Sequence, residues 1–144
     1  VYFGNTDNLI CRYIRFRGGY ATNNDSIGGY YINTAIFDHC SIGFGGDEAF
    51  PIIVDTPAET GGDITIQNCL LAESSTGSIM GGTEAPNNVD DISLMGNVFY
   101  NISHRFPNVN SNGNYEAINN YVHNHKKRMI RGNGSYKINE INNE

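Results

Sequence analysis

The stretch AIFDHCSI, from Ala35 to Ile42, alternates between side chains suited to a protein core and side chains suited to solvent. The same pattern recurs along the chain as LICRYIRF from Leu9, ITIQNCLL from Ile64, ISLMGNVF from Ile92, YEAINNYV from Tyr115 and INEINN from Ile138. Alternation with a period of two predicts a short strand in each segment. Because the segments recur every 23 to 29 residues, we expect one such strand in each turn of a solenoid.

Aligning the segments without gaps produces columns of similar residues. The eighth column is apolar throughout, with Phe16, Ile42, Leu71, Phe99 and Val122. The sixth column contains Ile14, Cys40, Cys69, Asn97, Asn120 and Asn143, where the asparagines can stack as a ladder and tolerate a left-handed backbone. The pattern predicts an all-β fold, a right-handed parallel β-helix of about five to six turns over residues 1–144.

Composition agrees with a solenoid and excludes other folds. The 144 residues include 21 Asn, 17 Ile and 17 Gly but only 4 Leu, so a helical bundle and a leucine-rich horseshoe are both excluded. A propeller would need a longer repeat with several paired strands. No apolar stretch reaches the roughly 20 residues of a membrane span, so we expect no membrane partner. Since the repeat breaks off in its sixth copy, we expect a segment of a longer protein without its terminal caps.

Two of the three cysteines share a column. Cys40 and Cys69 are one turn apart, and neighbouring strands lie about 4.8 Å apart. This spacing permits a disulfide, but it also fits stacked, buried thiols, and Cys11 falls in another column. Both pairing states remain open from the sequence.

Charges are distributed unevenly around a net charge of −6. Between Gly18 and His104 there are 11 acidic residues and no Lys or Arg, whereas six basic residues lie from Arg105 to Lys137. This distribution leaves no broad basic face, so we expect no nucleic-acid partner.

Candidate site residues follow the sixth column by seven and eight positions. These offsets give Asp47 and Glu48 in the second turn, His104 and Arg105 in the fourth, and Lys127 and Arg128 in the fifth. Asp25 reaches this flank only if the longer first loop folds back along it. Each feature has an ordinary explanation as a solvated turn or a structural ion pair. Together, however, clustered carboxylates beside an arginine fit a calcium site, since Ca²⁺ takes 6–8 oxygen ligands.

In these motifs the chain resembles the pectate lyase family of calcium-dependent parallel β-helix enzymes. LICRYIRFRGG, DSI, IFDHCS and HRFPNV resemble family motifs in the same order along the chain. The resemblance implies calcium ligation by Asp25 and Asp47, with Glu48 as a further ligand, and it implies that Arg105 is the base that removes the C5 proton in a β-elimination. It also implies a structural role beside the site for Asp38 and His39. Basic residues that could bind the carboxylates of an acidic polysaccharide are His104, Lys127, Arg128 and Arg131.

The resemblance further implies a secreted, extracellular or periplasmic protein, which we expect to be monomeric. One departure concerns a family lysine, because Thr76 and Gly77 occupy its expected position. Two alternatives therefore remain besides a lyase of polygalacturonate. The first is a non-catalytic β-helix that binds carbohydrate or forms part of a fibre, and the second is a hydrolase of the polygalacturonase kind.

Overall fold

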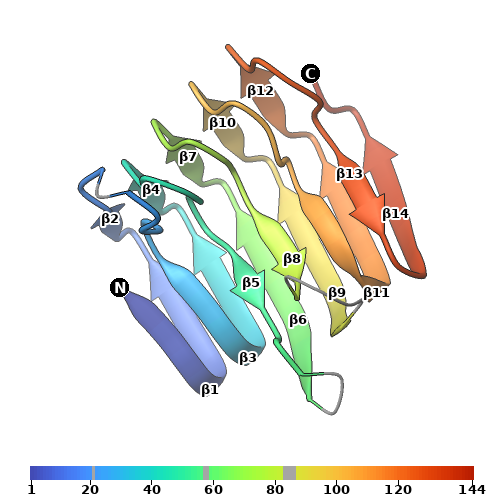
Figure 1. The fold of residues 1–144 in the computed structure, drawn as a ribbon. Coiled ribbons are helices and arrows are strands. Elements are labelled where there is room, and N and C mark those ends of the chain that lie inside the picture. Colours follow the sequence, from blue (N-terminus) through green and yellow to red (C-terminus); the bar gives the residue numbers. More distant parts are fainter. Residues whose placement is uncertain (21, 57–58, 83–86) are drawn as a thin grey trace.

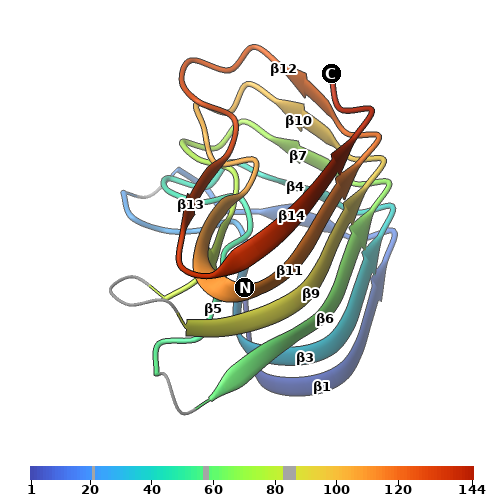
Figure 2. The same ribbon diagram turned by 90° about the vertical axis from the view of Figure 1, so that its right-hand side faces the viewer.

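The fold is a parallel β-helix (Figure 1). The computed structural model describes residues 1–20, 22–56, 59–82 and 87–144. Within these ranges, every regular element is a β-strand. The turns stack along one axis, and Figure 2 shows them as a series of similar coils, one above the next. Within the described ranges, no helix is long and apolar enough to cross a membrane. The parallel β-helix predicted from the repeat is confirmed.

Two sheets run along the solenoid. The five-stranded sheet contains β2 (Arg15–Arg17), β4 (Ser41–Gly43), β7 (Leu70–Ala72), β10 (Val98–Tyr100) and β12 (Tyr121–His123), one strand from each turn. The nine-stranded sheet contains β1 (Tyr2–Arg12), β3 (Gly28–Asp38), β5 (Ile52–Ile53), β6 (Thr60–Gln67), β8 (Ile79–Gly81), β9 (Asn87–Met95), β11 (Asn108–Ile118), β13 (Arg131–Asn133) and β14 (Tyr136–Ile141). Its longest strands bend, so that β3 pairs with β5 near its start and with β6 near its end.

The predicted columns correspond to the observed register between turns. Ala35 pairs with Leu9 on one side and Ile64 on the other, as the ungapped alignment requires. The residues ten positions after the sixth column, such as Phe50 and Ile79, were expected on the inward face of a second sheet, and both are at or beside short strands of the bent sheet, β5 and β8. The predicted strand from Ala35 to Ile42 is not a single strand, because β3 ends at Asp38 and β4 begins at Ser41 after the corner.

Left-handed residues produce the corner between the two sheets. His39, Asn68 and Asn119 occupy equivalent positions in the second, third and fifth turns, with φ values of 53°, 51° and 54°, and Gly96 takes this position in the fourth turn. The left-handed residues thus come one position before the sixth column, whose asparagines were expected to have this conformation and do not. Asn adopts this conformation more readily than most residues because its short polar side chain bonds locally. The Asn-rich composition therefore fits the corners of the solenoid.

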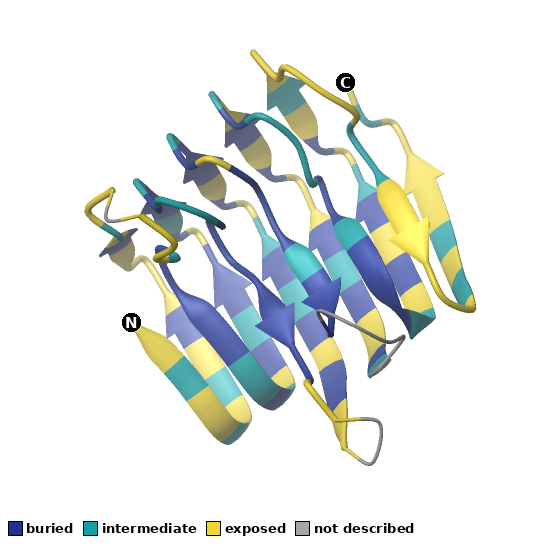
Figure 3. Ribbon diagram, viewed as in Figure 1, coloured by how far each residue is buried: buried dark blue, intermediate teal, exposed yellow. Residues whose placement is uncertain are grey.

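The core fills the interior between the sheets. Phe16, Ile42, Leu71 and Phe99 of the eighth column are all buried, and Val122 packs against them from the last turn. Phe37 stacks edge-on against Phe50, with 4.6 Å between ring centroids. Burial is most complete in the middle turns, whereas β13 and much of β14 are exposed (Figure 3). The middle turns therefore provide the most rigid support for side chains on the surface.

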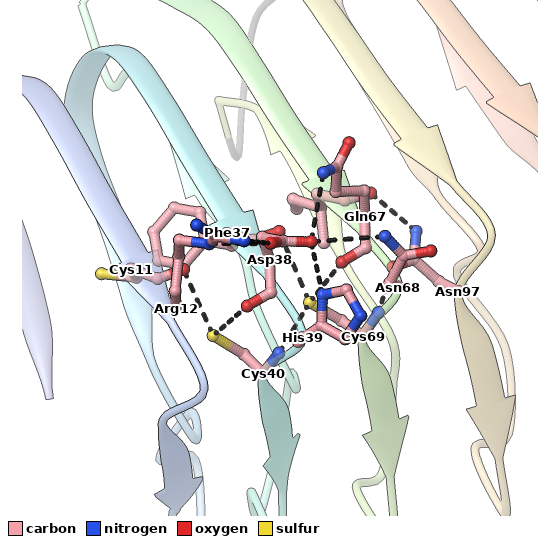
Figure 4. Close-up of polar contacts among 11 residues, drawn as sticks. Cys11, Arg12, Phe37, Asp38, His39, Cys40, Gln67, Asn68, Cys69 and Asn97 are labelled. Carbon is pink, nitrogen blue, oxygen red and sulfur yellow. Dashed lines mark hydrogen bonds and ion pairs between the residues drawn. The ribbon is translucent and has the colours of Figure 1, made fainter.

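An amide ladder runs beneath the same corner. Asn97 donates its side-chain amide to Asn120, 3.1 Å away, and Asn120 donates to Asn143 at 3.0 Å. Cys40 and Cys69 continue the column toward the first turn as free, buried thiols, drawn in Figure 4. Burial raises the pKa of Cys69 to about 12. The structure therefore favours the stacked thiols over the disulfide.

Candidate functional site

Three carboxylates gather on the flank that follows the small sheet. Asp25 lies in the loop between β2 and β3, whereas Asp47 and Glu48 lie between β4 and β5. One oxygen from each side chain lies within 4.8 Å of the others. The three candidate calcium ligands named from the sequence are therefore neighbours in space.

The first loop folds back along the second turn, as the sequence analysis required. The Asp47 amide donates to the carbonyl of Asn24 at 3.2 Å, and the Ser26 amide donates to the carbonyl of Glu48 at 3.0 Å. The side chain of Asp25 accepts a hydrogen bond of 3.0 Å from the Glu48 amide. Backbone pairing thus holds the loop, and with it Asp25, against the acidic pair.

The electrostatics of this cluster disfavour three negative charges. Burial first, and then the charge of Asp47, raise the pKa of Asp25 to about 6. Arg105 and the N-terminus lower this pKa, but burial and Asp47 outweigh them. The positive charge near the cluster is therefore too small to balance its carboxylates. A hard cation with oxygen ligands, such as Ca²⁺, would supply that charge, so the residues present fit such an ion.

Arg105 approaches the cluster from the fourth turn. Arg105 lies between β10 and β11 with a φ of 73°, and its Nη1 forms an ion pair with Oε1 of Glu48. The Glu48 side chain is only 8% exposed, and that of Arg105 is 29% exposed. The sequence placed these residues two turns, or about 10 Å, apart. The long guanidinium side chain spans that gap, and spacing between columns alone did not reveal the contact.

Thr76 and Gly77 occupy the turn between the acidic pair and Arg105. Thr76 pairs with Glu48 in an isolated parallel bridge, and its hydroxyl lies 3.5 Å from Oδ1 of Asp47. At Gly77, a Cβ atom would overlap the backbone carbonyl oxygen of Arg105. The Ser78 amide donates to that same oxygen at 2.8 Å. A side chain therefore cannot be added at position 77, one of the two positions where the family lysine is expected, without moving the Arg105 backbone.

Of the four predicted basic residues, His104 lies beside Arg105, and Lys127, Arg128 and Arg131 follow later in the chain. Burial, and then the charges of Lys127 and Arg128, lower the pKa of His104, against an opposing effect of Asp47. Nδ1 of His104 is buried and has no hydrogen-bond partner among the described residues. Arg131 pairs through its backbone with Asn108 at the start of β13, and its side chain is exposed. Lys127, Arg128 and Arg131 thus form an exposed basic strip after Arg105, whereas His104 is half-buried beside Arg105.

Asp38 and His39 belong to a separate polar cluster at the end of β3 (Figure 4). Asp38 accepts hydrogen bonds from His39 at 2.7 Å and Gln67 at 3.1 Å, and it also accepts one from Asn68. Arg12 of β1 adds an ion pair at 2.9 Å. Burial alone would raise the pKa of this carboxyl, but its four side-chain partners outweigh burial and hold the pKa well below its usual range. These contacts connect three turns of the solenoid, which fits a structural role for Asp38 and His39.

Replacing Asp38 with Asn is expected to lower the melting temperature at pH 7. A carboxyl group whose pKa is depressed by folding stabilises the protein above its unfolded-state pKa of about 4 and loses that contribution as the pH falls. The difference between the two proteins should therefore narrow progressively as the pH falls below about 4, as measured by circular dichroism during heating. Asp63→Asn removes the same charge from an exposed position and serves as the control. An Asp38→Asn effect that is independent of pH would contradict this explanation.

Comparisons with known proteins find relatives over most of the chain. Over 124 residues the chain is 35% identical to probable pectate lyase C of Aspergillus fumigatus and of Aspergillus terreus, and 33% identical to that of Emericella nidulans. Each match covers 85% of this chain but 27% of the relative, so the chain spans about a quarter of the length of these proteins. No family model matches the chain, and no solved structure matches it either. Over most of its length the chain is therefore similar in sequence to proteins named probable pectate lyase C, and its own fold is a parallel β-helix.

Proposed function

We propose that the chain carries the calcium-dependent site of a lyase that cleaves polygalacturonate, an acidic polysaccharide, by β-elimination. The observation that carries the proposal is the position of Arg105 against the cluster of Asp25, Asp47 and Glu48. The names of the relatives support the same reaction. A polymeric substrate of this kind also implies that the protein acts outside the cell.

In the proposed reaction, Asp25, Asp47 and Glu48 would hold the cation, which would supply positive charge that makes the C5 proton of the sugar more acidic. Arg105 takes that proton, a double bond forms between C4 and C5, and the glycosidic oxygen leaves from C4. The exposed side chains of Lys127 and Arg128 bind further substrate carboxylates. Since arginine has a pKa above about 12, we expect activity to rise toward alkaline pH.

The test is an assay of the protein with polygalacturonate and calcium at mildly alkaline pH. The ultraviolet absorbance of the unsaturated product should appear, and a chelator should abolish it. Arg105→Ala should lower the rate at least about 100-fold, which is typical for the loss of a general base. The matched control is Arg15→Ala, which removes an exposed arginine from β2 in the first turn. If the wild-type protein forms no unsaturated product, the proposal is wrong.

A non-catalytic role in binding polyuronate is the second candidate. It is favoured by Gly77, which cannot accommodate a lysine, and by the ion pair that holds Arg105 on Glu48. Calcium-dependent retention on polygalacturonate without product would support this candidate. Hydrolysis is disfavoured, because carboxylate oxygens within 4.8 Å are closer than the about 6.5–9.5 Å of inverting glycosidases.

A further inference from the structure

The contact between Arg105 and Glu48 joins the two halves of the proposed site. Glu48 is a member of the carboxylate cluster, whereas Arg105 is the residue that would act on the substrate. Within the described residues, no other ion pair involves Glu48. The Glu48 carboxylate therefore pairs with the guanidinium in this structure and would bind the cation in the proposed reaction.

From this geometry we propose that the cation and Arg105 compete for Glu48, so that cation binding releases the arginine from the cluster. The proposal rests on the proposed function, since it assumes that the cluster holds Ca²⁺. A divalent ion among these carboxylates would lie close to the guanidinium and repel it, and Glu48 is too buried for water to screen that repulsion. The paired state and the cation-bound state therefore exclude each other.

This competition links two properties that are otherwise independent. While Arg105 is paired, its guanidinium is held on the buried Glu48 carboxylate and is not available to the substrate. Once released, the side chain can turn toward the exposed flank, where Lys127 and Arg128 lie on the next turn. The arginine would thus face the substrate only when the cation is bound.

Competition also lowers the affinity for the cation, because binding must first break the ion pair. Removing the guanidinium should therefore tighten binding. A partner that contributes one hydrogen bond to a charged group shifts an equilibrium by about tenfold when it is lost. A distant positive charge should have a much smaller effect, since solvent and salt screen it.

The experiment is calorimetric titration of the whole chain with Ca²⁺ alone, without substrate. We expect Arg105→Gln to bind Ca²⁺ about tenfold more tightly than the wild-type protein. The control, Lys137→Gln, removes one positive charge from an exposed position in β14 and should change the affinity by less than about twofold. Thermal unfolding of each variant verifies that it is folded.

A second measurement follows Arg105 directly. In nitrogen–proton spectra, the side-chain Nε–H signal that disappears in Arg105→Gln should shift when Ca²⁺ is added to the wild-type protein. Equal affinities of the wild-type protein and Arg105→Gln, or an unmoved signal at saturating Ca²⁺, would overturn the competition while leaving the calcium site in place. Absence of Ca²⁺ binding in every variant would instead overturn the proposed site itself.

Discussion

An Asn97→Ala variant is expected to lose about 3 to 5 kcal/mol of its free energy of unfolding. Asn97 is 1% exposed, its Oδ1 accepts a hydrogen bond of 2.9 Å from the Cys69 amide, and its Nδ2 donates to the carbonyl of Ile66 at 2.8 Å. Alanine would leave both backbone groups buried without a partner, and each such group costs about 1–3 kcal/mol. The loss should be larger than that of any exposed asparagine.

Urea denaturation followed by circular dichroism measures this effect. The matched control is Asn139→Ala, at an exposed position in β14, which should change the free energy of unfolding by less than about 0.5 kcal/mol. A loss below about 1 kcal/mol for Asn97→Ala would mean that water or a neighbouring side chain satisfies the two backbone groups, and it would contradict the role assigned to the ladder.

The ladder illustrates how much of the fold the sequence predicts. A column of asparagines with apolar columns on either side fixed the register, because stacked turns must repeat both burial and corner geometry. The cysteines at the other end of the column were harder to interpret, since 4.8 Å permits either a disulfide or stacked thiols. In the structure the Cys40 amide lies 3.3 Å from the sulfur of Cys69, so sulfur takes the position of the asparagine oxygen.

The site was predictable only as far as the backbone repeats. The column offsets identified the acidic pair and Arg105, and they stated the condition under which Asp25 joins them. They did not identify the contact between Glu48 and Arg105, because it depends on how far a long side chain reaches across turns. They also did not show that Gly77 lies directly against the Arg105 carbonyl, since close backbone approach leaves no signal other than the glycine itself.

Gly77→Ala is the second change expected to have a large effect, with a loss of about 3 kcal/mol in the free energy of unfolding. The added methyl group would overlap the carbonyl oxygen of Arg105, and a rigid backbone on both sides cannot yield as a side chain would. The hydrogen bonds from Gly77 to His104 and from Ser78 to Arg105, at 2.9 and 2.8 Å, would both be displaced. Arg105 would then move relative to Glu48, so we expect lyase activity to fall together with stability.

Gly4→Ala is the matched control, because the nearest atom to its added methyl group is the Tyr30 carbonyl oxygen at an ordinary 3.9 Å. Urea denaturation should show a change of less than about 0.5 kcal/mol for Gly4→Ala. If Gly77→Ala were equally harmless, the Arg105 backbone would be able to shift, and a lysine could be introduced at position 77. In that case backbone packing would not explain why the chain has no lysine at position 77. If Gly77→Ala is destabilising, close backbone packing excludes a lysine from position 77, the one of the two expected positions that lies against the Arg105 carbonyl.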